Sequence, residues 1–278
     1  MPVLSQIFIY PIKSLAGISV SDWPVDRNGL QYDRKWMLVD SEGQFLSQRR
    51  LPKMALIRTR IDADALIVSA AGHSELNLPL QPMDGEDLTV RIWRDDCIAR
   101  LVSDKANAWF RSVLDLDCRL VYHPDHRQRQ VDQKYAAPND QTAFSDGFPF
   151  LLIGENSLHS LNQQMTETID MPRFRPNLVV TDCSAYAEDT WRRIEINHIE
   201  FRLPKPCSRC SVPTIDPTTA LTGKEPLATL NRLRKWNNQV YFGQNALHGS
   251  QGSLSVGQQV LILETGRNQP PLNDPVSD

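Results

Sequence analysis

Residues 205–217 of the chain read KPCSRCSVPTIDP, and they hold the only local cysteine pattern in the sequence. A structural zinc site commonly takes four ligands from two such pairs, and an iron–sulfur cluster needs about four cysteines, which this segment does not supply. A thioredoxin-like disulfide would open a helix after a strand, whereas prolines lie on both sides of this pair. The remaining local interpretation is one activated thiolate, because Arg209 next to Cys210 favours the charged sulfur that binds soft metals.

The other cysteines of the chain, Cys97, Cys118 and Cys183, are isolated in the sequence. An odd number of cysteines without a signal peptide is typical of reduced thiols, and we interpret these three as small buried hydrophobic residues. The first residues, MPVLSQIFIYPIKS, lack the basic and apolar regions of a signal peptide, so we expect a cytoplasmic protein.

The composition restricts the class of protein further. Apolar residues make up 41% of the 278 positions and charged residues 23%, which is ordinary for a soluble globular chain that buries a sizeable core without disulfides. The formal net charge of −3 gives no reason to expect a nucleic acid polymer or an anionic membrane as the partner. No stretch of the sequence approaches the roughly 18–20 apolar residues of a membrane span.

Short strands dominate the pattern on both sides of the cysteine segment. Apolar runs bounded by turn residues predict strands at residues 3–10, 35–39, 55–61, 65–69, 75–80, 88–93, 97–102, 119–122, 150–153, 178–181, 191–196 and 199–203, and closing strands within 253–263 with Gly257 at the bend. The sequence also predicts three helices, of which one is capped by Ser103, one is capped by Asn156 or Ser157, and one follows Pro226. Short strands at this spacing favour a barrel or a sandwich.

The long polar segment at residues 123–140 is the predicted junction between two modules. We therefore divide the chain into a β-rich domain at residues 1–122, a second strand-rich domain at residues 123–265, and a tail at residues 266–278. The tail reads GRNQPPLNDPVSD, a proline-rich composition without apolar periodicity that is typical of a linker or a disordered end.

The segment at residues 205–216 resembles the signature of the MOSC domains in the mitochondrial amidoxime-reducing component and its bacterial relatives of the YcbX type. Other matching pieces follow in the same order, and they read YPIKS at 10–14, GL at 29–30, DR at 33–34, FSDG at 144–147, FRPN at 174–177, YAED at 186–189, EPL at 225–227 and FGQN at 242–245. Each piece alone is weak, but the ordered combination is specific. The resemblance implies a mainly β fold with peripheral helices (α+β), in which an N-terminal β-rich domain packs on a MOSC β-barrel.

The family binds a pterin-dithiolene molybdenum cofactor, and one cysteine ligates the metal. The resemblance assigns that role to Cys210, whereas Cys207 matches a position that does not ligate the metal. The resemblance also implies that Asp146 is a catalytic residue with a supporting or proton-handling role. The implied contacts to the cofactor and its phosphate, for which arginine and lysine are suited, are Lys13, Ser14, Arg34, Gly147, Phe148, Arg175, Asn177, Ser208, Arg209 and Asn245. Because these residues come from both halves of the chain, we expect the site between the two domains.

The implied activity is that of a molybdenum-dependent oxidoreductase, which reduces N-hydroxylated substrates such as amidoximes and N-hydroxylated bases and so serves in detoxification. The cofactor does the oxygen-atom chemistry, and the protein binds and orients it. We expect electrons from a ferredoxin-like or flavin reductase partner, in trans or on a missing C-terminal domain, because no cysteine follows Cys210 and this chain holds no iron–sulfur cluster of its own. The family as a whole is also associated with pyridoxal phosphate binding, which we note at the level of the family only.

Two other interpretations stay open. A non-catalytic carrier of the cofactor, or a sulfur-handling module, would need the phosphate-binding residues without a substrate pocket, and MOSC domains elsewhere are attached to cofactor sulfurases. A thiol–disulfide protein that uses Cys207 and Cys210 would show a reversible disulfide and no molybdenum.

Overall fold

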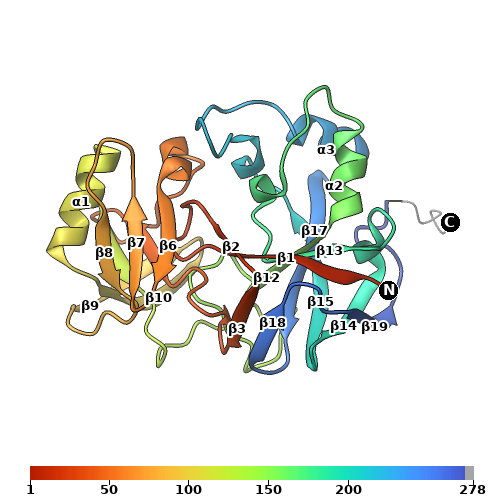
Figure 1. Ribbon diagram of the computed structural model, residues 1–278, viewed down its shortest axis with the longest axis horizontal. Coiled ribbons are helices and arrows are strands. Elements are labelled where there is room, and N and C mark those ends of the chain that lie inside the picture. The colour runs from red at the N-terminus through yellow and green to blue at the C-terminus, as the bar shows by residue number, and fades with distance from the viewer. Residues whose placement is uncertain (273–278) are drawn as a thin grey trace.

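The computed structural model describes residues 1–272 of the chain, which form two strand-rich lobes side by side (Figure 1). The lobe on the left of the view holds α1 (Asp104–Leu114) and the strands from β6 (Arg58–Asp62) to β10 (Asp95–Leu101). The other lobe holds the largest sheet with α2 (Glu155–Asn162) and α3 (Leu227–Leu233). The mainly β fold with peripheral helices that the sequence predicts is confirmed.

Within the described residues, nine strands form the largest sheet. Its order is β19 (Val260–Thr265), β14 (Trp191–Ile196), β15 (Ile199–Ser208), β17 (Gln239–His248), β12 (Phe150–Gly154), β13 (Leu178–Thr181), β1 (Val3–Ile9) and β2 (Ile18–Val20), and β16 (Lys235–Trp236) pairs with β17. Neighbouring strands run antiparallel except β12 and β13, which run parallel because the segment with α2 carries the chain back between them. The first two strands of the chain thus complete a sheet whose other strands all follow residue 149.

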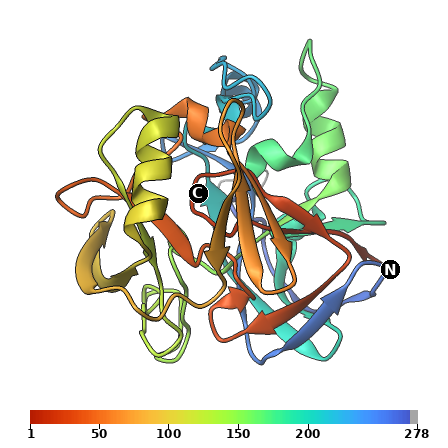
Figure 2. The same cartoon turned by 60° about the vertical axis from the view of Figure 1, so that its left-hand side comes forward.

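Three smaller sheets make up the rest of the strands in residues 1–272. One joins β5 (Trp36–Val39), β11 (Arg119–Tyr122), β10 and β9 (Asp87–Ile92), a second joins β6, β7 (Ala65–Ser69) and β8 (Leu76–Pro79), and a third joins β18 (Gly252–Ser255), β3 (Asp22–Asp26) and β4 (Gly29–Leu30). In the turned view, the sheet of β6, β7 and β8 comes forward with α1 beside it (Figure 2).

Local sequence explains where the helices begin. The hydroxyl of Ser103 accepts a hydrogen bond from the Ala106 amide, so the predicted cap of α1 is confirmed, and Phe110 lies buried one turn further on the same face. The cap predicted for α2 is wrong by two or three residues, because Gly154 occupies that position while the Ser157 hydroxyl binds a buried glutamate. The third helix follows Pro226 as predicted.

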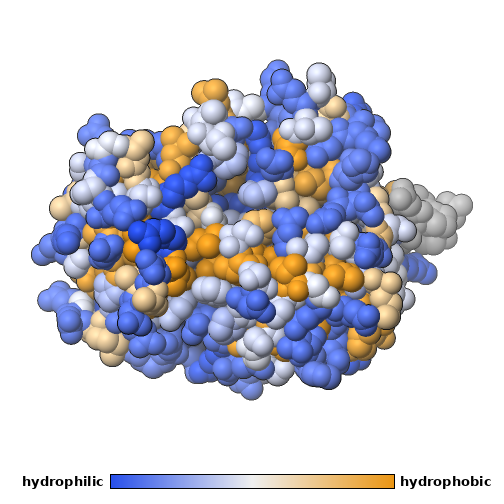
Figure 3. All heavy atoms as spheres, in the orientation of Figure 1, coloured by the Kyte–Doolittle hydropathy of each residue, from blue (hydrophilic) through white to orange (hydrophobic). Residues whose placement is uncertain are grey.

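The described residues form four buried apolar clusters, and the two largest support these layers. One lies against the nine-stranded sheet and includes Leu4 and Ile7 of β1 with Phe201 of β15, and all three are fully buried. The other fills the space between α1 and the strands around it, where Trp36 and Phe110 are fully buried. On the face of Figure 1, apolar residues form a band across the middle, and hydrophilic residues cover most of the rims (Figure 3).

Several strands differ from the prediction. The ten-residue strand β17 and the short strands β2 and β3 were not predicted, and β15 runs on to Ser208, five residues past its predicted end. The strand predicted at residues 55–61 begins only at Arg58, because a 3-10 helix opened by Pro52 occupies Pro52–Leu56. The other predicted strands lie within one to three residues of observed ones.

The end of the described chain returns to the large sheet. The Gly266 amide donates to the Thr190 carbonyl, and the Gln269 amide donates to the Asp189 carbonyl. The rest of the predicted tail, residues 273–278, lies outside the described residues. The division of the chain at residue 122 stays a prediction, and strands from both sides of it pair within one sheet. No helix in residues 1–272 is both long and apolar enough to cross a membrane, and the cytoplasmic location stays a prediction as well.

Candidate functional site

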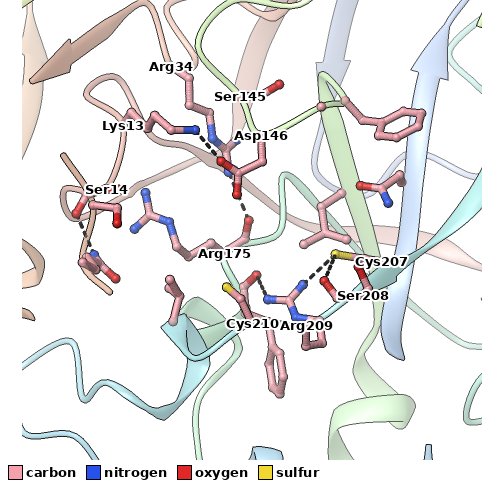
Figure 4. Close-up of a pocket in the computed structure, with 18 of the residues that line it drawn as sticks. Lys13, Ser14, Arg34, Ser145, Asp146, Arg175, Cys207, Ser208, Arg209 and Cys210 are labelled. Atoms are coloured by element: carbon pink, nitrogen blue, oxygen red, sulfur yellow. Dashed lines mark hydrogen bonds and ion pairs between the residues drawn. The ribbon is translucent and has the colours of Figure 1, made fainter. Parts of the chain in front are cut away.

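One pocket brings together all twelve residues that the sequence predicts for the site. Its lining includes Lys13, Ser14, Arg34, Asp146, Gly147, Phe148, Arg175, Asn177, Ser208, Arg209, Cys210 and Asn245. Lys13, Arg34 and Asp146 lie at one side of the pocket, the segment Cys207 to Cys210 lies at the other side, and Arg175 lies between them (Figure 4). The pocket is therefore built from both halves of the chain, as the sequence predicts.

Loop residues at strand ends supply the main charged side chains. Lys13 follows β1, Arg34 precedes β5, Arg175 precedes β13, and Cys210 follows β15. The backbone φ angles of Arg34 and Arg175 are 49° and 57°, in the left-handed region that residues other than glycine adopt rarely. Twelve other non-glycine residues of the described chain share this conformation, so it sets the direction of the two arginine side chains but does not by itself mark a functional site.

Tyr10 connects these two arginines. The guanidinium carbons of Arg34 and Arg175 lie over its ring, 4.4 and 4.2 Å from the ring centroid. Its hydroxyl donates to the Pro176 carbonyl at 3.0 Å, and burial raises the pKa of the phenol to about 12. Burial lowers the pKa of Arg175 to about 10, so this arginine is still charged at neutral pH. The ring therefore holds two cations close together and directs them at one pocket.

Arg34 is fixed further by a carboxylate and an amide. Its Nη1 donates to Asp33 Oδ2 at 2.5 Å and to Asn177 Oδ1 at 3.0 Å. Asp33 also accepts from the Tyr10 amide at 2.7 Å, and burial raises the pKa of its carboxyl while Arg34 opposes that shift. Asn177 is almost fully buried, and its side-chain amide reaches the Phe8 carbonyl on β1. The predicted residue Asn177 thus acts mainly as a clamp between strands that orients Arg34.

Lys13 and Asp146 form an ion pair at the same side of the pocket as Arg34. Lys13 Nζ donates to Asp146 Oδ1 at 2.5 Å and to the Phe144 carbonyl at 2.7 Å. Burial lowers the pKa of Lys13 to about 8, although Asp146 opposes that shift. The surrounding protein would raise the pKa of Asp146, but Lys13 and a hydrogen bond from Trp93 outweigh this effect and hold it below its ordinary value. Asp146 is therefore ionised at neutral pH and serves here to hold Lys13.

The cysteine side of the pocket has a different arrangement. Arg209 Nη1 donates to the Cys207 sulfur at 3.1 Å, and its Nη2 donates to the Phe174 carbonyl at 2.7 Å. Cys210 is a half-buried free thiol that lines the pocket. The Nε atom of Arg209 is buried and finds no hydrogen-bond partner among the described residues.

Comparisons with known proteins identify the family. The MOSC N-terminal beta barrel domain matches residues 1–117, and the MOSC domain matches residues 139–261. Mitochondrial amidoxime-reducing component 1 of Mus musculus is 34% identical, over 94% of this chain and 82% of its own length. The protein of that name from Homo sapiens is 32% identical over the same shares. The chain belongs to the MOSC family.

Another relative of this MOSC protein is considerably longer than the chain. Molybdenum cofactor sulfurase of Oryza sativa is 31% identical, over 92% of this chain but only 35% of its own length. Among solved structures, the crystal structure of the YUAD protein from Bacillus subtilis covers 94% of each chain at 9% identity with a TM-score of 0.43.

The pocket of this MOSC protein suits an anion that brings its own metal ligands. Lys13, Arg34, Arg49, Arg175 and Arg209 line it, against one lining carboxylate that Lys13 already binds. Within residues 1–272, no group of three or more histidine, cysteine, aspartate or glutamate side chains could hold a metal ion without other ligands. A soft metal beside Cys210 would therefore need most of its ligands from a bound molecule.

Three residues that position the charged side chains of this site were not predicted as part of it. Tyr10 stood in a motif that matched the family, but it was given no role. Arg49 lines the pocket with its guanidinium 3.7 Å from Asp146, and Trp93 donates its indole N–H to the same carboxylate at 3.1 Å. Trp93 could have been noticed in the sequence, because it is the aromatic residue at the end of the predicted strand at 88–93. The sequence holds no comparable signal for Arg49.

Proposed function

We propose that this protein binds a molybdenum cofactor, with Cys210 as the protein ligand of the metal, and reduces N-hydroxylated substrates such as amidoximes. The observation that supports this proposal most strongly is the pocket itself, which places the free thiols of Cys207 and Cys210 opposite Lys13 and Arg34, with Arg175 between them. Curated relatives at 32–34% identity are named amidoxime-reducing components, which favours the same reaction class.

The residues present fit such a cofactor. A pterin-dithiolene molybdenum cofactor carries a phosphate and supplies sulfur ligands, so it needs cations at one end and a single soft ligand at the other. Arg34 and Arg175 would hold the phosphate, because Tyr10 and Asp33 already fix their positions.

The cofactor, when bound, would supply the two-electron chemistry that cleaves an N–O bond, with two protons taken up and the oxygen released as water. The chain's residues would bind and orient it, and Asp146 would keep Lys13 in place at the rim of the pocket. Both electrons would come from an iron–sulfur or flavin protein, because the described residues present no cluster of cysteines for an iron–sulfur centre.

Turnover of benzamidoxime to benzamidine tests the enzymatic part of this proposal. The protein is produced in a host that makes the cofactor and is reduced by an artificial donor such as reduced methyl viologen. We expect Cys210→Ala to lower the rate by more than about 100-fold, because a lost metal ligand disrupts the site more than a lost neighbour does.

Cys207→Ala is the matched control, since Cys207 lies in the same motif and contacts Arg209 rather than a metal. We expect this variant to keep most of the activity. Full activity in Cys210→Ala, or equal loss in both variants, would contradict the assignment of the ligand.

A second candidate is a non-catalytic role as a cofactor carrier or sulfur-handling module. The similarity of nearly the whole chain to part of a molybdenum cofactor sulfurase favours it. Bound molybdenum without any N-reductive turnover, in the presence of a donor that reduces the metal, would support this second role over the enzyme.

A further inference from the structure

An outer groove continues the pocket beyond Asp146 and Gly147. Both residues line the inner pocket and the groove, and so does Phe148. Trp93 and Tyr135 complete the aromatic lining of the groove. Neither was among the residues that the sequence or the family resemblance assigns to the site. A molecule that reaches the inner pocket along this path would thus pass three aromatic side chains.

Trp93 has an unusual position for so large a side chain. It occupies, with Arg94, the two-residue turn between β9 and β10, and its φ angle is 57°. Asparagine or glycine is the usual choice in such turns, and a bulky residue with positive φ is a true outlier. Its side chain nevertheless stays 43% exposed. Strain of this kind persists where surrounding contacts enforce it, and it is concentrated at ligand-binding positions.

Neighbouring side chains hold the Trp93 ring in one place. The indole N–H donates to Asp146 at 3.1 Å, the Arg49 guanidinium carbon lies 4.1 Å from the ring centroid, and the Phe45 ring packs edge-on at 4.9 Å. The exposed part of the indole is therefore a preorganised apolar surface at the junction of pocket and groove. A rigid aromatic surface binds a planar ring with little loss of side-chain entropy.

The other aromatic residues of the groove are also partly exposed. The ring centroids of Tyr135 and Phe148 lie 6.1 Å apart, and Lys205 Nζ lies 4.6 Å from the Tyr135 ring centroid. The groove is also lined by three carboxylates, Asp95, Asp132 and Asp146, and by three cations, Arg94, Arg129 and Lys205. Asp95 pairs with Arg129, and Asp146 pairs with Lys13 of the inner pocket. Because the carboxylates of the lining do not outnumber its cations, the groove suits an uncharged ring better than a cation.

Gly147 leaves the passage between the groove and the inner pocket open. A Cβ atom added at this glycine would meet no atom within 4 Å. A side chain at this position would point into open space rather than into packed protein, so the absence of a side chain there keeps the junction wide.

We propose that this groove is a subsite for the uncharged aromatic body of the substrate, with Trp93 as its main contact. This inference rests on the proposed function, since the N–O group of the same molecule would reach toward Cys210. Benzamidoxime, with a phenyl ring, should bind much better than acetamidoxime, which carries the same reacting group on a methyl.

Isothermal titration calorimetry of the oxidised holoenzyme with the two amidoximes tests the subsite without turnover. We expect Trp93→Ala to weaken benzamidoxime binding by about tenfold and acetamidoxime binding by less than about twofold. Trp93→Phe loses the N–H to Asp146 but keeps a ring, so it should retain most of the discrimination. Tyr135→Ala, in a surface loop, should weaken benzamidoxime binding alone by a smaller factor.

Trp109→Ala is the matched control, because Trp109 is a partly exposed tryptophan of α1 that lines neither the pocket nor the groove. Equal effects of Trp93→Ala on both amidoximes, or identical behaviour of Trp93→Phe and Trp93→Ala, would overturn the subsite. If the protein reduces both amidoximes and binds them equally well, the subsite is overturned while the proposed function stands. Discrimination in binding without any turnover would support the subsite and count against the proposed function.

Discussion

Tyr10 holds the two positively charged guanidinium groups of Arg34 and Arg175 close together. Arg34 and Arg175 both stack on its ring, and the single carboxylate of Asp33 reaches only one of them directly. The aromatic face attracts both cations, which offsets part of their mutual repulsion. The protein thereby prepares a pair of guanidinium forks that suits a dianionic phosphate.

Substitution of Tyr10 should weaken anion binding before it affects anything else at the site. We expect Tyr10→Leu to raise the dissociation constant of inorganic phosphate for the cofactor-free protein by about fivefold to tenfold, because both stacking contacts are lost. Tyr10→Phe keeps the ring and should change it little. Isothermal titration calorimetry measures this directly.

Tyr122→Leu provides the control, since Tyr122 is equally buried and its ring lies 5.7 Å from Lys35, away from the pocket. This variant should lose stability without losing phosphate affinity. A similar loss of affinity in both leucine variants would show that Tyr10 acts only through general stability.

Lys13 makes the anion affinity depend on pH. Its pKa is lowered to about 8 by burial, so its charge is lost as the pH rises through that value. Sulfate keeps its charge over this range, and we expect its dissociation constant to rise by about tenfold between pH 7 and pH 9.5. Lys13→Arg should remove most of this dependence, because arginine stays charged. A flat profile in the unmodified protein would contradict a role for Lys13 in anion binding.

The lowered pKa of Lys13 also makes the free energy of unfolding depend on pH in a definite direction. Between about pH 8 and its ordinary value of 10.5, Lys13 is neutral in the folded protein and charged in the unfolded chain. The unfolded state binds more protons in this window, so the contribution of Lys13 to the free energy of unfolding rises with pH there.

Every residue that the sequence resemblance assigns to the site lines the pocket, but the resemblance does not show how each one acts. Asp146 was expected to be catalytic, and the structure places it in an ion pair with Lys13 and a hydrogen bond with Trp93. Trp93 and Arg49 reach the pocket only through the packing of a hairpin tip against a loop. No local pattern encodes that approach, because it depends on long-range pairing of the strands.

Strand β17 shows the limit of prediction at the level of elements. It carries Gly243 with a φ angle of 77°, Gln244 and Asn245 in its middle, a composition that argues against a strand. Gln244 is nevertheless fully buried, and Asp189 and the Gln269 carbonyl accept from its amide. Those partners come from segments far away in the sequence, so the hydrogen bonds that stabilise this strand exist only in the folded molecule and cannot be read from the strand's own residues.

Strand β15 was predicted too short for a related reason. Pro204 and Pro206 lie inside it and cannot donate to a neighbouring strand. The pairing with β17 shifts register between Arg202 and Lys205 and again between Pro206 and Ser208, which accommodates both prolines. These irregularities end the strand at the cysteine segment.

Gly243 should be far less tolerant of a side chain than Gly257. Both have positive φ, but a Cβ at Gly243 would lie 2.6 Å from Ile153 Cγ1 and 2.8 Å from the Leu152 carbonyl oxygen, whereas Gly257 has open space. We expect Gly257→Ala to lower the free energy of unfolding by about 1–2 kcal/mol and Gly243→Ala by about 2–5 kcal/mol. Urea denaturation measures both, and equal losses would contradict the steric account.

At the scale of the whole molecule, the sequence predicted the fold class and the convergence of both halves on one site. It did not predict that β1 pairs with β13 or that β3 pairs with β18, contacts between residues more than 170 positions apart. Hydrophobic periodicity reports which face of a strand is buried, but not which strand lies beside it. These pairings are what bring Lys13 and Arg34 to the same pocket as Cys210.

The measurement that tests the account most directly is the molybdenum content per chain, by elemental analysis, after expression in a host that makes the cofactor. We predict nearly one molybdenum per chain in the unmodified protein and in Cys207→Ala, and a large loss in Cys210→Ala. Stoichiometric metal that Cys210→Ala retains in full, or no metal in any of the three proteins when the host's cofactor supply is verified, would contradict the claim that this pocket holds a molybdenum cofactor through Cys210.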